Sequence, residues 1–258
     1  MRAIVQHRYG GPEQLALAEV EAPAPAAGEV LIRVAAVAIS MGDVLLMRGE
    51  PRAVRLAFGL RRPKRPIIGR DVAGEVVAVG DAVTRFAIGD AVFAESDQGG
   101  FAEFVAVPER FVAVRPTSVD AVHAAAVVVS GTTALQGLRL AGVGPGQHLL
   151  VNGASGGVGG YAVQLAKGRG AEVTGVCRGA KAEHVRAIGA DHADIRGDDA
   201  TRLHIDSGCL EIEDGECCGP AECVHAITLW PSTDTSGIPA QRAPGSLRAA
   251  QHSRRGPA

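Results

Sequence analysis

The chain has few aromatic residues, no long apolar run and little cysteine over most of its length. Phe, Trp and Tyr make up 3% of the 258 residues, which argues against a surface that stacks nucleic-acid bases. No run of about 18 uninterrupted apolar residues is present, so we expect no helix that spans a bilayer. The amino terminus, MRAIVQHRYGG, lacks an apolar secretory core. These absences predict a cytoplasmic protein with neither a membrane nor a nucleic-acid partner.

Cysteine is distributed unevenly along the chain. Only Cys177 precedes the last quarter of the sequence, and the other four cysteines lie within Cys209–Cys223. A disulfide framework is not expected in a cytosolic chain of this size. A zinc site that combines these cysteines with His204 or His225 is an alternative, although no Cys-x-x-Cys pair supports it.

Neither sign of charge dominates the composition. The formal net charge is −2, with 47% hydrophobic and 21% charged residues, which is typical of a globular protein that buries a sizeable core. The basic run Arg61, Arg62, Lys64 and Arg65 is a local exception, and a nucleic-acid patch is one interpretation of it. Pro63 interrupts the run and no aromatic residue accompanies it, so we favour a solvated loop.

Residues 1–118 have the pattern of a small antiparallel β unit. Runs with strand character occupy Glu29–Val37, Val72–Val79 and Phe101–Val107, with glycine and proline turns between them. Helix signals are few in this part of the chain, and Met41–Arg48 is the best short candidate.

Residues 119–203 have a different pattern, in which helices and strands alternate. Asp120–Ala141 is rich in alanine and leucine and ends at glycine and proline, as helices often do. The elements predicted after it are a strand (His148–Asn152), a glycine turn, a helix (Tyr161–Arg169), a strand (Glu172–Cys177) and a helix (Lys181–Ile188). This β-α-β-α order predicts the start of a doubly wound parallel sheet.

The glycine turn carries the strongest chemical signal in the sequence. It has the form Ala154-x-Gly156-x-x-Gly159 between a strand and a helix. A glycine at the middle position lets the backbone approach a pyrophosphate, and the last one lets helix and strand pack closely. Because a second strand follows at the expected distance, the turn predicts a dinucleotide site. The alternative is a glycine-rich turn without a ligand.

The end of the second strand indicates which dinucleotide is bound. NAD sites carry an acidic residue there for the ribose hydroxyls, but no carboxylate lies between Val173 and Ala182. Arg178 and Lys181 are present instead, and two cations suit the additional phosphate of NADP(H). The alternative is that both are ordinary solvated side chains.

Several motifs together resemble a known family. The segment GRDVAGEVVAVGDAVTRFAIGDAVFA from Gly69 to Ala94, the segment AAAVVVSGTTALQGL and the glycine turn occur in the order and spacing of the zinc-independent, quinone oxidoreductase-like medium-chain dehydrogenases/reductases. The resemblance covers about residues 1–200. It implies an α/β chain in which a GroES-like antiparallel β domain (1–118) precedes a Rossmann sheet. It also implies NADPH-dependent hydride transfer to a quinone, an enone or a related carbonyl compound, which would be a small-molecule substrate.

The resemblance also implies roles for individual residues. Thr133 matches a position on the nicotinamide side of the cofactor, and the phosphates would contact the turn residues Ala154, Ser155, Gly156, Gly157, Val158 and Gly159. Ser40 and Asp43, in the stretch SMGD, are the candidate catalytic residues, with a strand-end cap and a helix cap as alternatives. The family's zinc-ligand positions hold Ser40, Arg70 and Ser130, so no metal is expected.

The family pattern ends near residue 200. Residues 204–258 show no period of 2 or 3.6, so we expect only a partial Rossmann domain (119–203) and an irregular, poorly packed tail. A shifted reading frame is our hypothesis for its origin. Without a further strand, His148–Asn152 would be an open sheet edge, and a family-type homodimer would be doubtful. The alternative to an active oxidoreductase is therefore a catalytically impaired remnant that binds cofactor weakly or only associates with other proteins.

Overall fold

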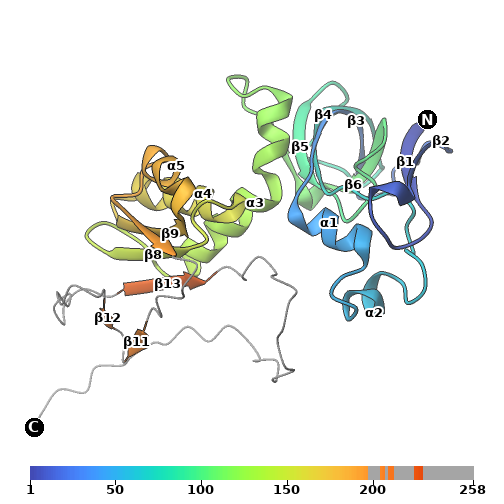
Figure 1. Ribbon diagram of the computed structural model, residues 1–258. Helices are drawn as coiled ribbons and strands as arrows, with labels where there is room; N and C mark the ends of the chain where they lie inside the picture. The colour runs from blue at the N-terminus through green and yellow to red at the C-terminus, as the bar shows by residue number, and fades with distance from the viewer. Residues whose placement is uncertain (197–203, 207–208, 212–223, 229–258) are drawn as a thin grey trace, which may run out of the picture. The chain divides into compact units, whose positions relative to one another are not determined.

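The computed structural model describes residues 1–196 and three short strands at 204–206, 209–211 and 224–228 (Figure 1). It divides into two compact units, unit 1 (Met1–Thr132) and unit 2 (Thr133–Ala258). The division lies inside the long helix α3 (Ala121–Leu140). The domain limits at residues 118 and 203 stay predictions.

Unit 1 is built around a five-stranded antiparallel sheet with the strand order β6-β3-β4-β5-β7. Its strands are β3 (Glu29–Ala38), β4 (Asp71–Val79), β5 (Ala91–Glu95), β6 (Phe104–Pro108) and β7 (Val112–Val114). A separate antiparallel pair joins β1 (Arg2–Gln6) to β2 (Leu15–Glu19). The antiparallel β unit expected for the first part of the chain is therefore confirmed.

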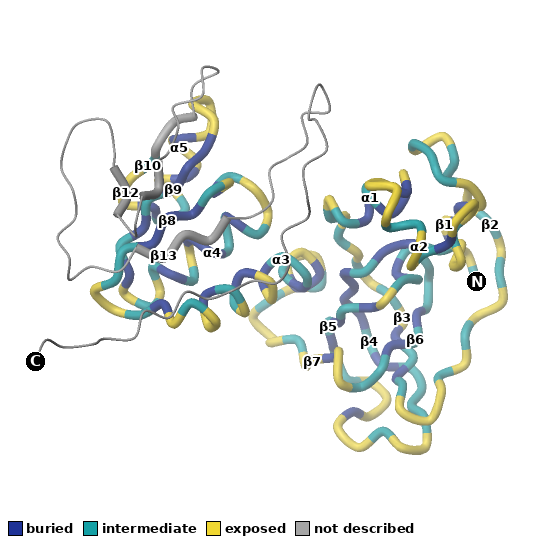
Figure 2. Tube along the Cα trace, turned by 90° about the horizontal axis from the view of Figure 1, so that it is seen from below, coloured by how far each residue is buried: buried dark blue, intermediate teal, exposed yellow. Residues whose placement is uncertain are grey.

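Alternation along these strands produces the core of unit 1. Every second residue of β3 and β4 points inward, so that Val30, Ile32, Val72 and Val76 are fully buried. Figure 2 shows this buried layer in dark blue within the sheet. β-Branched side chains dominate it, since they pack well on a pleated surface.

Short helices connect the strands of unit 1. They are η1 (Pro12–Gln14), α1 (Met41–Arg48), α2 (Val54–Phe58) and η2 (Glu109–Phe111). Helix α1 has the bounds predicted from the sequence. It ends at Gly49, whose φ of 64° is the left-handed conformation that glycine adopts without a Cβ penalty.

Helix α3 contributes to both units. Ala124 and Ala125 pack in unit 1 with Ala73 of β4, whereas Ala134 and Leu138 belong to the core of unit 2. By length and composition alone the helix could cross a membrane, a test that core helices of soluble proteins also pass. Helix α3 meets this criterion although polar residues interrupt its apolar sequence. The search of the sequence for uninterrupted apolar runs therefore did not identify it.

Unit 2 contains a parallel sheet with the strand order β10-β9-β8-β13. Its strands are β8 (His148–Asn152), β9 (Glu172–Arg178), β10 (His192–Arg196) and β13 (Val224–Thr228). The connections contain α4 (Gly157–Gly168), η3 (Gly179–Lys181) and α5 (Ala182–Ala187). The order corresponds to the first four positions of a doubly wound sheet. The alternating sequence predicts the part of this sheet that contains β8, α4, β9 and α5, whereas β10 and β13 were not predicted.

The predicted open edge at β8 is wrong. Strand β13 pairs with it in parallel register, from Val224↔His148 to Thr228↔Asn152. Strand pairing requires only backbone hydrogen-bonding groups. The five residues VHAIT can therefore form a strand, although the sequence around them shows no hydrophobic periodicity. The chain also forms a small hairpin of β11 (His204–Asp206) and β12 (Cys209–Glu211). The rest of the predicted irregular tail, with Cys217, Cys218 and Cys223, lies outside the described residues.

Candidate functional site: the glycine turn and strand ends of unit 2

The glycine turn joins β8 to α4 and is held against the neighbouring strand. The backbone N–H groups of Gly153 and Ala154 both donate to the carbonyl of Val176 in β9, at 3.1 Å. Gly153 has a φ of 79°, and its carbonyl accepts from the N–H of Gly156 at 2.9 Å. These bonds fix the turn at the carboxyl edge of the parallel sheet, where doubly wound folds bind ligands.

Close packing explains why Gly159 must be a glycine. A Cβ atom at this position would lie 2.2 Å from the carbonyl oxygen of Gly153, which is a backbone atom. Gly175 in β9 has the same role on the strand side, since its Cβ would meet Val185 at 2.5 Å and Ala154 at 2.9 Å. Helix α4 and the turn thus touch at Gly159 without an intervening side chain, and Gly175 leaves room for the side chains of Val185 and Ala154.

The first turn of α4 exposes its backbone to solvent. Gly156 is the N-cap, with φ −85° and ψ 172°, and no side chain caps the helix there. Gly156 and Gly157 are exposed, Ser155 and Val158 are half-buried, and Ala154 and Gly159 are buried. The first N–H groups of a helix have no acceptor inside it and carry its positive partial charge. The exposed residues of the turn therefore present backbone N–H groups to an anion, and the buried residues Ala154 and Gly159 fix the backbone conformation. This arrangement fits a pyrophosphate.

Two exposed cations follow on the adjacent strand. Arg178 is the last residue of β9 and Lys181 the last of η3. Both side chains are exposed, and neither has an ion pair within the part of the chain that the structure describes. Since Asn152 pairs with Val176, the end of β9 lies at the same sheet edge as the glycine turn. These cations are available for a phosphate beside it.

Sequence reasoning missed a third basic position. Arg196 is the register partner of Arg178 across β10 and β9, and it therefore lies at the same edge of the sheet. The spacing of the glycine motif reaches only the second strand, so it gave no reason to examine β10. A search of every strand end for basic residues would have found Arg196.

In unit 1, Ser40 and Asp43 form the cap of α1. Ser40 accepts from the N–H of Asp43 at 3.3 Å, and both its N–H and its hydroxyl donate to Asp43 Oδ2 at 2.8 Å. This is a capping box with aspartate in the third position. Asp43 is 1% exposed and its Oδ1 has no partner within the described part of the chain. The two side chains largely satisfy one another, and a catalytic role for them stays a prediction.

A second buried carboxyl, Asp71, lies near Asp43. Asp71 is 3% exposed and its Oδ1 accepts from the N–H of Val129 at 3.0 Å. Burial raises the pKa of Asp71 from 3.8 to about 6, and the negative charge of Asp43 adds to this effect. Sequence reasoning gave this residue no role, because a lone aspartate in a strand does not reveal its burial.

The positions that correspond to the family's zinc ligands hold residues that make other interactions. Arg70 pairs with Glu95, Ser40 is the helix cap, and Ser130 is half-buried in α3. Within the described residues no three His, Cys, Asp or Glu side chains gather as a metal would require.

Thr133, at the start of unit 2, has an exposed side chain without a hydrogen bond to any described residue. Its neighbour Thr132 is different, since its hydroxyl donates to the carbonyl of Val128 at 2.6 Å. The contact of Thr133 with a nicotinamide stays a prediction.

Comparison with known proteins supports this architecture. Residues 26–117 match the alcohol dehydrogenase GroES-like domain. The chain is 39% identical over 219 residues to a chloroplast envelope quinone oxidoreductase homolog of Arabidopsis thaliana, and 36% identical over 179 residues to human quinone oxidoreductase. These alignments cover 81% and 68% of this chain, but only 65% and 52% of the relatives. The chain thus spans less than two thirds of the relatives' length.

Solved structures agree with the sequence relatives. Quinone oxidoreductase from Pseudomonas syringae superposes with a TM-score of 0.68 at 32% identity, covering 77% of this chain and 59% of that one. Escherichia coli quinone oxidoreductase complexed with NADPH gives 0.66 at 28% identity, with 75% and 58% coverage. Fold and matched domain define a medium-chain dehydrogenase/reductase, and the chain belongs to this family. Within the family it groups with the quinone oxidoreductase-like members.

Proposed function

We propose that the chain binds NADPH at the glycine turn of unit 2 and that the whole protein transfers a hydride to a quinone, an enone or a related carbonyl compound. The observation that carries this proposal is the exposed amide cradle at Gly156 and Gly157, with Arg178 and Lys181 at the neighbouring strand end. No carboxylate stands at that strand end to favour NADH. One relative is named an NADPH-dependent alkenal/one oxidoreductase, which agrees with the choice of cofactor and substrate class.

In this proposal the residues of the chain bind and orient. The first amides of α4 hold the pyrophosphate, Arg178 and Lys181 hold the additional phosphate by charge-assisted hydrogen bonds, and Thr133 contacts the nicotinamide side. Bound NADPH supplies the hydride. No described residue is assigned as general acid, so the proton comes from water, or the acceptor is a quinone whose reduced form is protonated in solvent.

The proposed reaction does not use zinc. At the three positions that correspond to zinc ligands, the chain carries two serines and an arginine engaged with Glu95, and none of these supplies a thiolate or an imidazole. Metal analysis of the dialysed protein should give well under one zinc per chain. Stoichiometric zinc that disappears in Ser40→Ala would overturn this part of the proposal, whereas zinc lost on changing Cys217 and Cys223 would indicate a separate site.

Titration of the purified full chain with NADPH and with NADH tests the cofactor assignment, and oxidation of NADPH in the presence of a simple quinone tests the reaction. We expect saturable binding that favours NADPH, and slow hydride transfer by this chain because a partial Rossmann sheet would not hold the nicotinamide in near-attack geometry. Turnover in the ordinary enzyme range of about 1–10³ per second would contradict the expectation of a partial Rossmann domain. Equal affinity for the two cofactors would refute the choice of NADPH.

A second candidate function is cofactor binding without turnover. The capping box favours it, because Ser40 and Asp43 are engaged with each other and with the start of α1. Saturable NADPH binding with no oxidation by quinones, enones or aldehydes would support this candidate over the first.

The location and the assembly of the protein are also proposals. We propose a cytoplasmic protein, although two relatives have names that place them in the chloroplast. A family-type homodimer is an open alternative to a monomer.

A further inference from the structure

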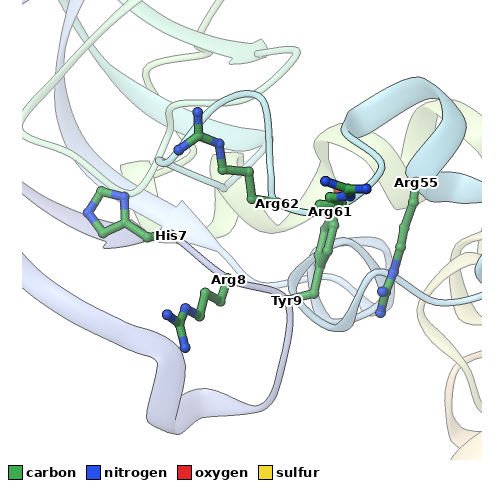
Figure 3. Close-up of a pocket in the computed structure, with 6 residues that line it drawn as sticks. All are labelled: His7, Arg8, Tyr9, Arg55, Arg61 and Arg62. Carbon is green, nitrogen blue, oxygen red and sulfur yellow. The ribbon is translucent and has the colours of Figure 1, made fainter.

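A cavity in unit 1 is lined mostly by arginines. Its volume is about 660 Å³, and its lining residues are His7, Arg8, Tyr9, Arg55, Arg61 and Arg62. They come from two segments, the loop after β1 and the segment 55–62 around α2. In Figure 3, His7, Arg8 and Arg62 extend toward one side of the view, and Tyr9, Arg61 and Arg55 lie toward the other. The lining includes four arginines and no carboxylate.

Three of these arginines have no partner within the described part of the chain. Other arginines of unit 1 pair with acids: Arg2 with Glu103, Arg33 with Glu75, and Arg65 with Asp97, at 2.7 to 3.0 Å. The side chains of Arg8, Arg61 and Arg62 are exposed and have no ion pair or hydrogen bond with any described residue. Unpaired like charges around one opening repel each other, and a bound anion would relieve this repulsion.

The wall of the cavity is held in place by specific contacts. The guanidinium of Arg55 lies 4.6 Å from the centre of the Tyr9 ring, and its Nε donates to the carbonyl of Gly49 at 2.9 Å. The Tyr9 hydroxyl donates to the carbonyl of Gly59 at 2.7 Å. Gln6 Nε2 donates to the carbonyl of Arg8 at 2.7 Å. The two segments are therefore joined, and a ligand does not have to order them.

A turn presents the two adjacent arginines. The N–H of Lys64 donates to the carbonyl of Phe58 at 2.8 Å, and Lys64 Nζ donates to the carbonyl of Ala57 at 2.7 Å. Gly59 has a φ of 122°, and a Cβ there would lie 2.1 Å from the carbonyl oxygen of Arg62. This closed turn contains Arg61 and Arg62, whose side chains are exposed.

We infer that this cavity is an anion site that takes a phosphate-bearing ligand with more than one charged group, such as a diphosphate. Arginine binds phosphate oxygens through paired N–H groups, and the cavity has room for more than a single phosphate. The guanidinium groups are spread around the opening instead of meeting at one point (Figure 3), which suits two linked anionic groups. All six residues belong to unit 1, so the site differs from the glycine turn of unit 2 and is independent of the proposed function.

The same chemistry occurs in soluble molecules and in lipid headgroups. Leu56 and Leu60 on this segment are 73% and 65% exposed, so a lipid surface has apolar contacts available beside the cations. The net charge of the whole chain favours no membrane partner, but a net charge does not reveal a local cluster of cations such as this one. The experiment must therefore include both sources of phosphate.

Calorimetric titration of the full chain with pyrophosphate is the first test. We expect saturation with a Kd below about 1 mM, and a weakening of about tenfold in Arg61→Ala and in Arg62→Ala. Arg110→Ala, which removes an exposed arginine elsewhere in unit 1, is the matched control for charge and should bind as the unchanged chain does.

Sedimentation with phosphatidylcholine vesicles, with and without phosphatidylglycerol, is the second test. Pyrophosphate binding without vesicle binding assigns a soluble ligand. Binding to the anionic vesicles alone, lost in Arg61→Ala and Arg62→Ala, assigns a lipid headgroup. If neither probe binds, or if Arg110→Ala weakens pyrophosphate binding as much as the cavity variants do, the inference is overturned. NADPH binding measured on the same variants keeps this result separate from the proposed function.

Discussion

The strand end of unit 2 and the cavity of unit 1 use the same chemistry but are assembled differently. Arg178 and Lys181 stand three residues apart beside a glycine turn that precedes them closely in sequence. In the cavity, residues 7–9 meet residues 55–62, and only the fold brings them together. In both places exposed cations lack acidic partners among the described residues.

The difference between the two regions lies in what orients the anion. At the glycine turn the backbone contributes amides, so side-chain cations only add selectivity for the additional phosphate. In the cavity no exposed helix start contributes, and the arginines and His7 must supply the contacts themselves. We therefore expect backbone changes to have the largest effect in unit 2 and side-chain changes to matter relatively more in unit 1.

Gly159→Ala gives the largest expected effect. The added Cβ would lie 2.2 Å from the carbonyl oxygen of Gly153, and a backbone atom cannot move aside as a flexible side chain can. We expect NADPH affinity to fall about 100-fold or more, with a loss of stability of about 1–3 kcal/mol. Fluorescence titration and urea unfolding measure the two quantities.

The control for this change is Gly168→Ala in the same helix, because a Cβ there meets nothing within 4 Å. It should bind NADPH normally and lose no stability, since alanine favours helix. Equal loss in both variants would show that the glycine turn is not what holds the nucleotide.

The sequence analysis predicted features that depend on neighbouring residues and missed features that depend on residues far apart in the sequence. Met41–Arg48 and His148–Asn152 were predicted with the bounds that the structure shows, because hydrophobic pattern and caps act within a few residues. The glycine turn was found for the same reason. Helix α4 begins at Gly157, earlier than Tyr161, since its first turn consists of glycines that carry no helix signal.

Features that depend on distant pairing were missed. Strand β13 was not predicted, because its five residues become a strand only by pairing with β8, about 75 positions earlier in the sequence. The raised pKa of Asp71 depends on burial beside Asp43, and the cavity depends on two segments meeting. No local pattern reports such contacts.

The comparison assumes that a charged side chain without an ion pair costs free energy. Asp71→Asn tests this assumption at a buried carboxylate. The pKa of Asp71 in the folded protein, about 6, lies above the ordinary 3.8, so the folded state binds more protons than the unfolded state between about pH 4 and pH 6. The contribution of Asp71 to the stability of the unchanged chain should therefore fall as the pH rises through this window. The amide oxygen introduced by Asp71→Asn can still accept from the N–H of Val129, and we expect this variant to gain up to about 3 kcal/mol at pH 7.

Urea unfolding at pH 4 and at pH 7 measures this effect, with Asp81→Asn at an exposed position as the control. The advantage of Asp71→Asn should shrink at pH 4, where the carboxyl is largely protonated in the folded state and partly protonated in the unfolded state. A chain whose stability rises steadily from pH 4 to pH 7, with no gain in Asp71→Asn, would contradict the assignment.

Arg178→Ala isolates the side-chain contribution at the glycine turn. Removal of one charge-assisted contact to a phosphate costs about 1.5–3 kcal/mol, so NADPH affinity should fall about tenfold or more. NADH lacks that phosphate, and its affinity should stay nearly unchanged. Arg186→Ala, which removes an exposed arginine from α5, should alter neither. Equal loss of both cofactors in Arg178→Ala would refute a phosphate contact by this residue.

The difference between Gly49→Ala and Gly142→Ala is the smallest expected effect, and it extends the comparison to unit 1. Gly49 has a φ of 64°, and a Cβ there would lie 2.6 Å from Arg55 Nε and 2.7 Å from Cδ1 of Tyr9. Gly142 has nearly the same φ, 66°, but its Cβ would meet nothing within 4 Å.

The pair Gly49→Ala and Gly142→Ala therefore separates two costs. Both variants force a left-handed alanine, at about 1–2 kcal/mol, and only Gly49→Ala also displaces the stacked Arg55 and Tyr9. Because the displaced atoms belong to side chains that can move, we expect about 1 kcal/mol of further destabilisation, measured by urea unfolding. Pyrophosphate binding should weaken several-fold in Gly49→Ala and remain unchanged in Gly142→Ala. If the two variants behave alike, the Arg55–Tyr9 stack does not hold the cavity open, and the arginines of unit 1 act without the preorganisation that the backbone provides in unit 2.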